Sequence, residues 1–434
     1  MLKKIHIENF KSLKNVDVPC AGLNLLMGIN GAGKSSFVQV LRLLDIAADH
    51  IEALLQKICA EDFGGGVEFK DIQYSYGTQS PTISVSFGDD KGGHYELERV
   101  LDDDDVDERP GIIDLHHPEY IKTLTAYLDM WELEARRDNG IDVSQEEIRN
   151  AQENGERASA EVQERILLDE HAAVDVYKRL WHGARFVDSF RQKPVDIREG
   201  GTYNRIPFIF FDDSHDSRDI RKFASEGQNT IEFLYKISQT VEGSHLIEDV
   251  NKCLDWVSPG ARLDIEEKRV GTHEYYVTTF DYGVNGDRRL FKPQNVGFGL
   301  NDILPVLVTL LTAKKGSIIV IENPEAHLHP RGQAEIGKLI AETASRGVQV
   351  FIETHSDHVI NGIRVAVKKG VLKPSDVNIA FFERKEHDVV DDEGKESREI
   401  FTTVRNIKVD ENGSLSEYPE DFMDEWNNQL MRLM

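Results

Sequence analysis

The run Gly28–Ser35 constrains this chain more than any other feature, because its letters G-I-N-G-A-G-K-S match the pattern G-x-x-x-x-G-K-[ST]. The short apolar run Leu23–Met27 leads into it. Glycines let the backbone curl so that several N–H groups point at phosphate oxygens, and the positive end of the following helix points at the same charge. Lys34 is expected to reach the β- and γ-phosphates of a nucleotide, and the Ser35 hydroxyl is expected to bind Mg²⁺. Chance produces such a match in a chain of this size with a probability on the order of a few per cent. The run therefore predicts a phosphate-binding loop.

Acidic residues follow a second apolar run. Ile318–Ile321 predicts a buried strand, Glu322 follows it directly, and Glu325 comes three residues later. Ligands bind at the carboxyl ends of strands in open α/β sheets. Glu322 stands where a carboxylate can hold Mg²⁺ through water, and Glu325 suits a general base that polarises an attacking water. Acids after a strand are usually structural, but their pairing with the phosphate loop favours the catalytic interpretation.

A third strand, predicted at Val348–Glu353, ends in Thr354-His355-Ser356. This places His355 at the same sheet edge, where its imidazole can contact the γ-phosphate and sense its loss. A lone histidine at a strand end is usually a capped surface residue. The order of phosphate loop, acidic strand and histidine favours the functional interpretation here.

Together these motifs resemble those of ABC-type ATPases. Gly28–Ser35, Ile318–Glu325 and Thr354–Ser356 look like the Walker A, Walker B and switch-histidine motifs. The run E-N-P-E-A-H-L-H-P at Glu322–Pro330 is similar to the SMC/RecF/OLD branch, which includes AAA-family ATPase subunits of bacterial anti-phage systems such as PARIS, Septu and retron-associated systems. Similar segments are also found at Ile7–Ser12, Asn295–Pro305 and Tyr418–Trp426. The resemblance covers residues 1–100 and about 184–434. It implies an α/β fold, namely an ABC-type P-loop ATPase head with a mixed sheet. It also implies that the chain binds ATP and Mg²⁺ and forms a dimer.

The resemblance also implies further site residues. The signature segment, here Val296–Leu300, docks on the γ-phosphate held by the other subunit, with Gly297 and Gly299 permitting close backbone approach. Gly297 stands where a serine is common, so Asn301 is a substitute donor. Gln73 is the candidate Q-loop residue and metal ligand, with Ser35 and Glu322. The residues implied to hold the nucleotide in the loop are Asn30, Gly31, Ala32, Gly33, Lys34, Ser35 and Ser36; His327 or His329 would lie near the dimer seam.

The middle of the chain has a different composition. Residues 101–170 hold 21 Asp+Glu against 7 Lys+Arg, which gives this segment a charge of −14 within the total of −26. Apolar residues recur at helical spacing over 118–183, and Ser144–Glu147 has the form of a capping box. We expect the N-terminal part of the ATPase domain at 1–101, an acidic helical insertion at 102–183, and the C-terminal part at 184–434. The insertion is either a packed lid or a partner-binding arm.

Charge and cysteine content narrow the function classes. A net charge of −26 argues against a surface built for nucleic acid, whose binding is dominated by phosphate contacts. No apolar run approaches the ~18–20 residues of a membrane span. Three widely spaced cysteines suit a reducing compartment, and we expect a cytoplasmic protein with no membrane partner.

The sequence thus favours a sensor or regulatory ATPase of a bacterial anti-phage system. ATP would close a homodimer or higher assembly, which would control an effector protein encoded nearby. After residue 357 we find no E-x-x-x-D followed by D-x-D, the arrangement that an OLD-type nuclease domain carries. The alternative is a RecF/SMC-like DNA-binding ATPase in repair or maintenance. It is less favoured because no concentrated Lys/Arg stretch is present. A non-hydrolysing scaffold is disfavoured because Lys34 and Glu325 are both present.

Overall fold

The computed structural model describes residues 1–49, 73–74, 81–88, 94–100, 176–177, 179–181, 184–189, 197–199, 230–241, 243–271, 273–283, 287–390 and 396–434. The helical hairpin expected over 118–183 lies outside the described residues, except for 176–177 and 179–181, which are helical. The expected domain boundaries therefore stay predictions.

A six-stranded sheet forms the centre of the molecule. Its strand order is β14-β13-β3-β12-β11-β6. All neighbours run parallel except β14, which is antiparallel to β13. The expected α/β fold with a mixed sheet is confirmed. The strand bounds are β3 Leu23–Gly28, β6 Arg185–Val187, β11 Ile318–Glu322, β12 Gln349–Glu353, β13 Val377–Val390 and β14 Glu396–Ile407.

The sheet is buried on both faces, which explains the continuous apolar runs of its inner strands. Alternate residues of each strand face opposite sides, so Ile319 and Ile321 of β11 join one core cluster. Ile318 and Val320 join the other. The periodicity of the strand thereby divides the hydrophobic core into two layers around one sheet.

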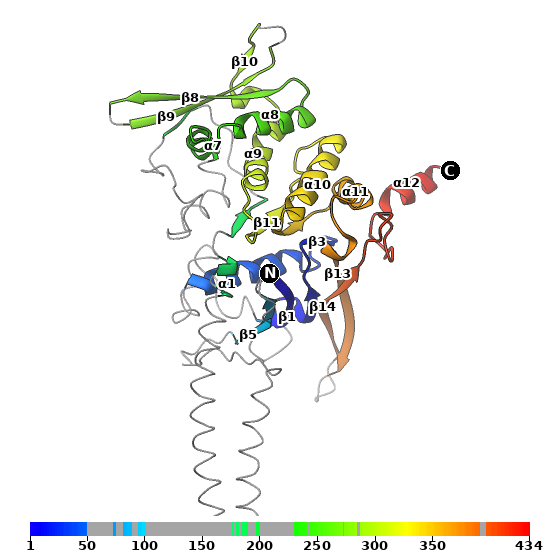
Figure 1. Ribbon diagram of the computed structural model, residues 1–434. Helices are drawn as coiled ribbons and strands as arrows, with labels where there is room; N and C mark the ends of the chain where they lie inside the picture. The colour runs from blue at the N-terminus through cyan, green and yellow to red at the C-terminus, as the bar shows by residue number, and fades with distance from the viewer. Residues whose placement is uncertain are drawn as a thin grey trace, which may run out of the picture.

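The second of these clusters lies between the central sheet and an antiparallel sheet of order β2-β1-β4-β5. Helix α1, Lys34–Asp49, belongs to this layer and buries Phe37, Val40, Leu41 and Leu44. Figure 1 shows α1 beside β3 and β1. The strand bounds are β1 Leu2–Phe10, β2 Leu13–Pro19, β4 Thr82–Gly88 and β5 His94–Val100.

Helices cover the opposite face of the central sheet. Helices α9, α10 and α11 lie on this side, and α8 joins them to an outer antiparallel sheet in which β9 pairs with β7, β8 and β10 (Figure 1). The helix bounds are α7 Thr230–Ser238, α8 Leu246–Val257, α9 Phe298–Leu311, α10 Pro330–Ser345, α11 Asp357–Lys368 and α12 Glu425–Leu433. The outer strands are β7 Ile197–Glu199, β8 Arg262–Val270, β9 His273–Asp281 and β10 Leu290–Phe291, and the 3₁₀ helices are η2 Pro293–Asn295 and η3 Pro374–Asp376. Within the described residues, no helix has both the length and the apolar character that crossing a membrane requires.

Candidate nucleotide site

The candidate site lies at the carboxyl edge of β3, β12 and β11. These strands are parallel neighbours, and their register pairs Leu26 with Glu353 and Glu353 with Glu322. Because parallel strands end at the same edge, the phosphate loop (residues 28–33), the acidic turn after β11 and the histidine turn after β12 all follow from that edge. The three motifs that the sequence singled out therefore lie together.

The phosphate loop needs its glycines for both conformation and space. Gly28, Gly31 and Gly33 have φ values of 135°, 77° and 104°, which L side chains rarely adopt. A Cβ on Gly28 would lie 2.2 Å from the carbonyl oxygen of Phe382 in β13. A Cβ on Gly33 would lie 2.6 Å from the hydroxyl of Thr402 in β14. The C-terminal hairpin thus packs against both ends of the loop.

Lys34 begins α1 and turns back over the loop. Its Nζ donates to the carbonyl oxygens of Gly28 and Ile29, at 2.9 Å each. The residue is only 3% exposed. Burial lowers the pKa of Lys34, and the negative charge of Glu353 opposes that shift. The ammonium group is therefore placed where phosphate oxygens of a bound nucleotide would meet it.

The two predicted carboxylates have different surroundings. Glu322 Oε1 lies 3.4 Å from Nη2 of Arg42, which projects from α1 and also pairs with Asp188. Glu325 lies in the turn after β11, and its Oε1 accepts a hydrogen bond of 2.9 Å from the backbone N–H of His355. The acidic turn is thus joined directly to the histidine turn, and the roles of base and phosphate sensor stay predictions.

The acidic turn has unusual backbone geometry. Asn323 and His327 have φ values of 46° and 60° although neither is glycine. The Asn323 N–H donates to the carbonyl oxygen of Glu353 at 2.8 Å, which holds the turn against β12. Non-glycine residues in this region cluster at functional sites.

His355 leaves the end of β12 with an exposed side chain. Partial desolvation and the positive charge of Lys34 lower its pKa. The imidazole is therefore neutral near pH 7 and can accept or donate a hydrogen bond, depending on its tautomer. The adjacent Thr354 is fully buried and Ser356 caps α11, so the histidine is carried on a rigid support.

Glu353 is a site residue that we did not predict. Ser35 Oγ donates to its Oε1 at 3.3 Å, and the residue is only 5% exposed. Burial and then the charge of Glu322 raise the pKa of Glu353, while Lys34 and the Ser35 hydrogen bond oppose the shift. The signal available in the sequence was an acid at the end of an apolar strand, directly before Thr354.

The signature segment packs against the acidic turn. A Cβ on Gly299 would lie 2.6 Å from the carbonyl oxygen of His327, so glycine is needed there for close packing. Gly297 precedes α9 and has no atom within 4 Å of its Cβ position. Phe298 between them is 61% exposed, with its ring 6.0 Å from the His327 ring. Asn301, the predicted substitute donor, gives an amide N–H to the carbonyl oxygen of Pro293 at 3.1 Å.

The remaining predicted residues lie as follows. Asn30, Gly31 and Ser35 are exposed, Ser36 is half-buried, and Ala32 is buried, with its carbonyl oxygen accepting a hydrogen bond from Thr402. His327 Nε2 lies 3.5 Å from Asp302, and His329 caps α10. Gln73 forms an isolated bridge with Phe10, so its role as Q-loop residue and metal ligand stays a prediction.

The described residues include no group of three His, Cys, Asp or Glu side chains able to hold a metal ion by themselves. Mg²⁺ fits the edge nonetheless, because it usually takes one or two carboxylates and completes its shell with phosphate oxygens and water. Ser35, Glu322 and Glu353 supply such a donor set. One oxygen of Glu353, Oε2, is buried without a hydrogen-bond partner.

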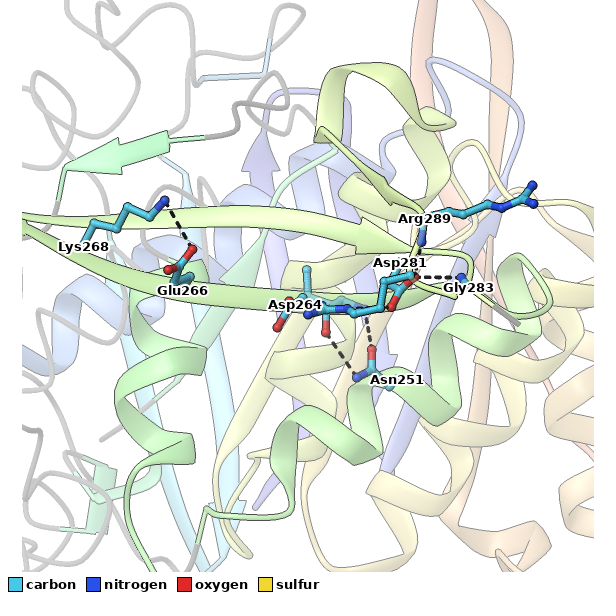
Figure 2. Close-up of polar contacts among 9 residues, drawn as sticks. Asn251, Asp264, Glu266, Lys268, Asp281, Gly283 and Arg289 are labelled. Atoms are coloured by element: carbon cyan, nitrogen blue, oxygen red, sulfur yellow. Dashed lines mark hydrogen bonds and ion pairs between the residues drawn. The ribbon is translucent and has the colours of Figure 1, made fainter. Parts of the chain in front are cut away.

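An open hollow of about 390 Å³ lies away from this edge, between α8 and the start of β8. Figure 2 shows how the polar groups of this region pair with one another. The side chain of Asn251 bonds the backbone of Leu263, and Asp281 accepts from the backbone N–H groups of Gly283 and Arg289. These contacts hold α8 and the turn after β9 in place.

Two family models match the chain. One, described as "AAA domain, putative AbiEii toxin, Type IV TA system", matches residues 23–361. The other, described as "Protein of unknown function (DUF3696)", matches residues 372–433. The first match covers well over half of the sequence and includes all three motifs of the site.

Individual relatives are more distant. An OLD nuclease of Thermus scotoductus is 26% identical over 121 residues, which are 25% of this chain and 22% of that protein. The match therefore spans about a fifth of the curated relative's length.

Solved structures that are similar include the SMC head domain of Thermotoga maritima, at 11% identity and a TM-score of 0.39, with 94% of this chain and 99% of that chain covered. The Smc head domain with an extended coiled coil of Pyrococcus furiosus, bound to the C-terminal domain of ScpA, has 12% identity and a TM-score of 0.42, with 100% and 99% covered.

Proposed function

The chain belongs to the AAA domain family that its residues 23–361 match, and from this premise we propose that it is an ATP-hydrolysing regulatory subunit of a bacterial defence system. In this proposal ATP and Mg²⁺ bind at the carboxyl edge of β3, β12 and β11. A second copy of the chain closes over the nucleotide. Cycles of binding and hydrolysis control an effector protein supplied by a separate chain.

The convergence of three motifs at one sheet edge carries the proposal. Lys34 holds the β- and γ-phosphates, and Ser35 with Glu322 holds Mg²⁺. When bound, the metal ion supplies positive charge that offsets the charge of the phosphate oxygens. The hydrogen bond between Glu325 and the His355 N–H supports the assigned roles, because it fixes the base relative to the phosphate-sensing turn.

Glu325 acts as the general base in this scheme. One carboxylate oxygen is held by the His355 backbone, so the carboxylate cannot rotate freely. The neutral imidazole of His355 contacts the γ-phosphate and releases it after cleavage. General-base catalysis of this kind contributes about 10²–10⁴-fold to a rate.

The proposed dimer uses the signature segment Val296–Leu300. Gly297 leaves open space at its Cβ position, and Phe298 is largely exposed. Both features leave this surface open to the approach of another molecule. Gly297, Gly299 and Asn301 would approach the nucleotide of the second copy through this surface.

Two observations support a protein effector over nucleic acid. The matched family is described by a toxin–antitoxin role. The net charge of −26 disfavours extended contact with a phosphate backbone. The acidic segment 102–183 is a candidate site for such a partner.

Steady-state ATP turnover of the purified chain tests the proposal, with Glu325→Gln and Lys34→Ala beside it. We expect Glu325→Gln to bind ATP, to slow turnover by about 10²–10⁴-fold, and to accumulate as an ATP-bound dimer in light scattering. Lys34→Ala should not bind ATP. If Glu325→Gln hydrolyses ATP at the parent rate, the assignment of the base is wrong. Strong stimulation by linear double-stranded DNA would instead support the RecF/SMC-like alternative.

A further inference from the structure

Ser35, the hydroxyl expected to bind Mg²⁺, contacts a carboxylate that does not belong to the Walker B segment. Its Oγ donates to Glu353 Oε1 at 3.3 Å. Glu353 is the last residue of β12, and the parallel register places it between β3, which leads into the phosphate loop, and β11, which carries Glu322. Glu353 therefore lies between the start of the phosphate loop and Glu322 at this edge of the sheet.

The second oxygen of this carboxylate has no partner. Glu353 is 95% buried, and its Oε2 is inaccessible and makes no hydrogen bond. A buried carboxylate oxygen without a partner is unfavourable in an ordinary core, because the charge loses water and gains nothing in return. The positive charge of Lys34 acts on this carboxylate, but Lys34 itself is hydrogen-bonded to the loop carbonyls of Gly28 and Ile29. The position is suited to a cation that arrives with the ligand.

Glu322, in contrast, is linked to a resident cation. Its Oε1 lies 3.4 Å from the guanidinium of Arg42. That guanidinium is fixed from two further directions, since it pairs with Asp188 and lies 4.8 Å from the centre of the Phe186 ring. Arg42 thus offsets part of the negative charge of Glu322, and this leaves Glu353 as the acid beside Ser35.

We propose that Glu353 is a metal-binding carboxylate of this site, and that Ser35 and Glu353 together hold the Mg²⁺ of Mg·ATP while Arg42 restrains Glu322. The proposal rests on the proposed function and adds a residue to its reaction. It assigns the acid before the Thr354-His355-Ser356 turn to cation binding rather than to strand structure. The Glu353 carboxylate and the Ser35 hydroxyl, with phosphate oxygens and water, satisfy the usual preference of Mg²⁺.

Nucleotide binding measured with and without Mg²⁺ tests this assignment independently of hydrolysis. Fluorescent N-methylanthraniloyl-ATP is titrated into the full chain in EDTA and then at increasing Mg²⁺. Glu353→Gln should raise the Mg²⁺ concentration for half-maximal tight binding by tenfold or more, in the range seen when metal-supporting residues are lost. Affinity in EDTA should be unchanged or higher, because a negative charge near the phosphates is removed. Glu353→Asp keeps the charge and should recover part of the Mg²⁺ dependence.

A matched substitution controls for general effects of Glu→Gln. Glu335 lies in α10, where it pairs with Lys338 at 2.6 Å and takes no part in the site. Glu335→Gln should bind nucleotide as the parent does at every Mg²⁺ concentration. Electron paramagnetic resonance of Mn²⁺ with ATP gives a direct second readout, since the protein-bound signal should disappear in Glu353→Gln and persist in Glu335→Gln.

Two outcomes would overturn the assignment. In one, Glu353→Gln requires the same Mg²⁺ concentration as the parent. In the other, Glu353→Gln and Glu353→Asp weaken binding equally in EDTA and in Mg²⁺, which would show that Glu353 only shapes the loop. A parent chain that binds Mg·ATP without hydrolysing it would contradict the proposed ATPase activity. The Mg²⁺ dependence of nucleotide binding would still test the role of Glu353.

Discussion

Two glycines fix the distance between the helices that follow the acidic and histidine turns. A Cβ on Gly337 of α10 would lie 2.3 Å from the carbonyl oxygen of Val359 in α11. A Cβ on Gly362 of α11 would lie 2.2 Å from the carbonyl oxygen of Ala334 in α10. The two backbones therefore touch reciprocally. We predict that Gly337→Ala forces α10 and α11 apart and destabilises the chain relative to a matched glycine substitution.

The magnitude follows from the contact distance. A carbon and a carbonyl oxygen approach to about 3.3 Å without strain, so relief of the 2.3 Å contact requires a displacement of about 1 Å. Overpacking of this kind costs about 1–3 kcal/mol. Replacing glycine by alanine within a helix also stabilises it by about 1 kcal/mol, which partly offsets the strain.

Gly332→Ala is the matched control, because it makes the same change in the same helix. A Cβ there meets its nearest neighbour, the Cβ of Leu328, at an ordinary 3.7 Å. Both variants replace glycine by alanine within α10, so the difference in their free energies of unfolding mainly reports the strain at Gly337. We expect Gly337→Ala to be less stable than Gly332→Ala by about 1–3 kcal/mol.

Urea unfolding followed by circular dichroism measures this difference. ATP turnover provides a second measurement, because α11 begins directly after the His355 turn and α10 after the acidic turn. Gly337→Ala should slow turnover even at low temperature, where the protein stays folded, because the Glu325–His355 hydrogen bond is displaced. Equal urea midpoints for the two variants, at equal slope, would show that the backbones do not make this contact.

Three further predictions concern other parts of the chain. Glu399 of β14 accepts hydrogen bonds from Lys14 and Tyr74. The Lys14 bond is the main reason that the pKa of Glu399 is lowered in the folded chain. The ionised carboxylate therefore stabilises the fold above the unfolded pKa of ~4.3, and this contribution is lost as the pH falls through the lower folded pKa. Glu399→Gln should cost about 1–2 kcal/mol at pH 7, and a cost that is just as large at pH 3 would contradict the ion pair. Cys253 is buried and its pKa is raised to about 12. Its thiol should therefore resist iodoacetamide at pH 8 in the folded chain and react after unfolding, which mass spectrometry of the peptide that contains it measures. Fast labelling of the folded chain would show that α8 is open. Thr402→Val removes the hydroxyl that donates to the Ala32 carbonyl oxygen at 3.0 Å. We expect the variant to bind ATP several-fold more weakly, as measured by equilibrium titration. An affinity equal to that of the parent would show that β14 does not shape the phosphate loop.

The inner strands of the sheet were predictable because burial on both faces leaves a continuous apolar run. Ile318–Ile321 and Val350–Glu353 therefore lie where the sequence indicated. Helix starts were less predictable. Helix α10 starts at Pro330, where His329, an uncommon cap, accepts from the Arg331 N–H.

Glu353 shows why part of the site could not be predicted. In the sequence it is one more residue of an apolar strand, 318 positions from Ser35. Only the order and register of β3, β12 and β11 bring it beside Ser35 and Glu322. Asn301, which the resemblance implies as a substitute donor, gives its amide N–H to the Pro293 carbonyl oxygen within the chain, and its role at the nucleotide stays a prediction.

The contacts of the phosphate loop with the C-terminal hairpin mean that this short motif is not a self-contained module. The carbonyl oxygen of Phe382 lies against Gly28, and the hydroxyl of Thr402 lies against Gly33. A chain shortened before Val377 would keep the Walker A, Walker B and switch-histidine motifs and lose the surface that shapes the phosphate loop. Substitutions in β13 and β14, more than 340 positions away in sequence, should accordingly behave in genetic screens as nucleotide-binding defects.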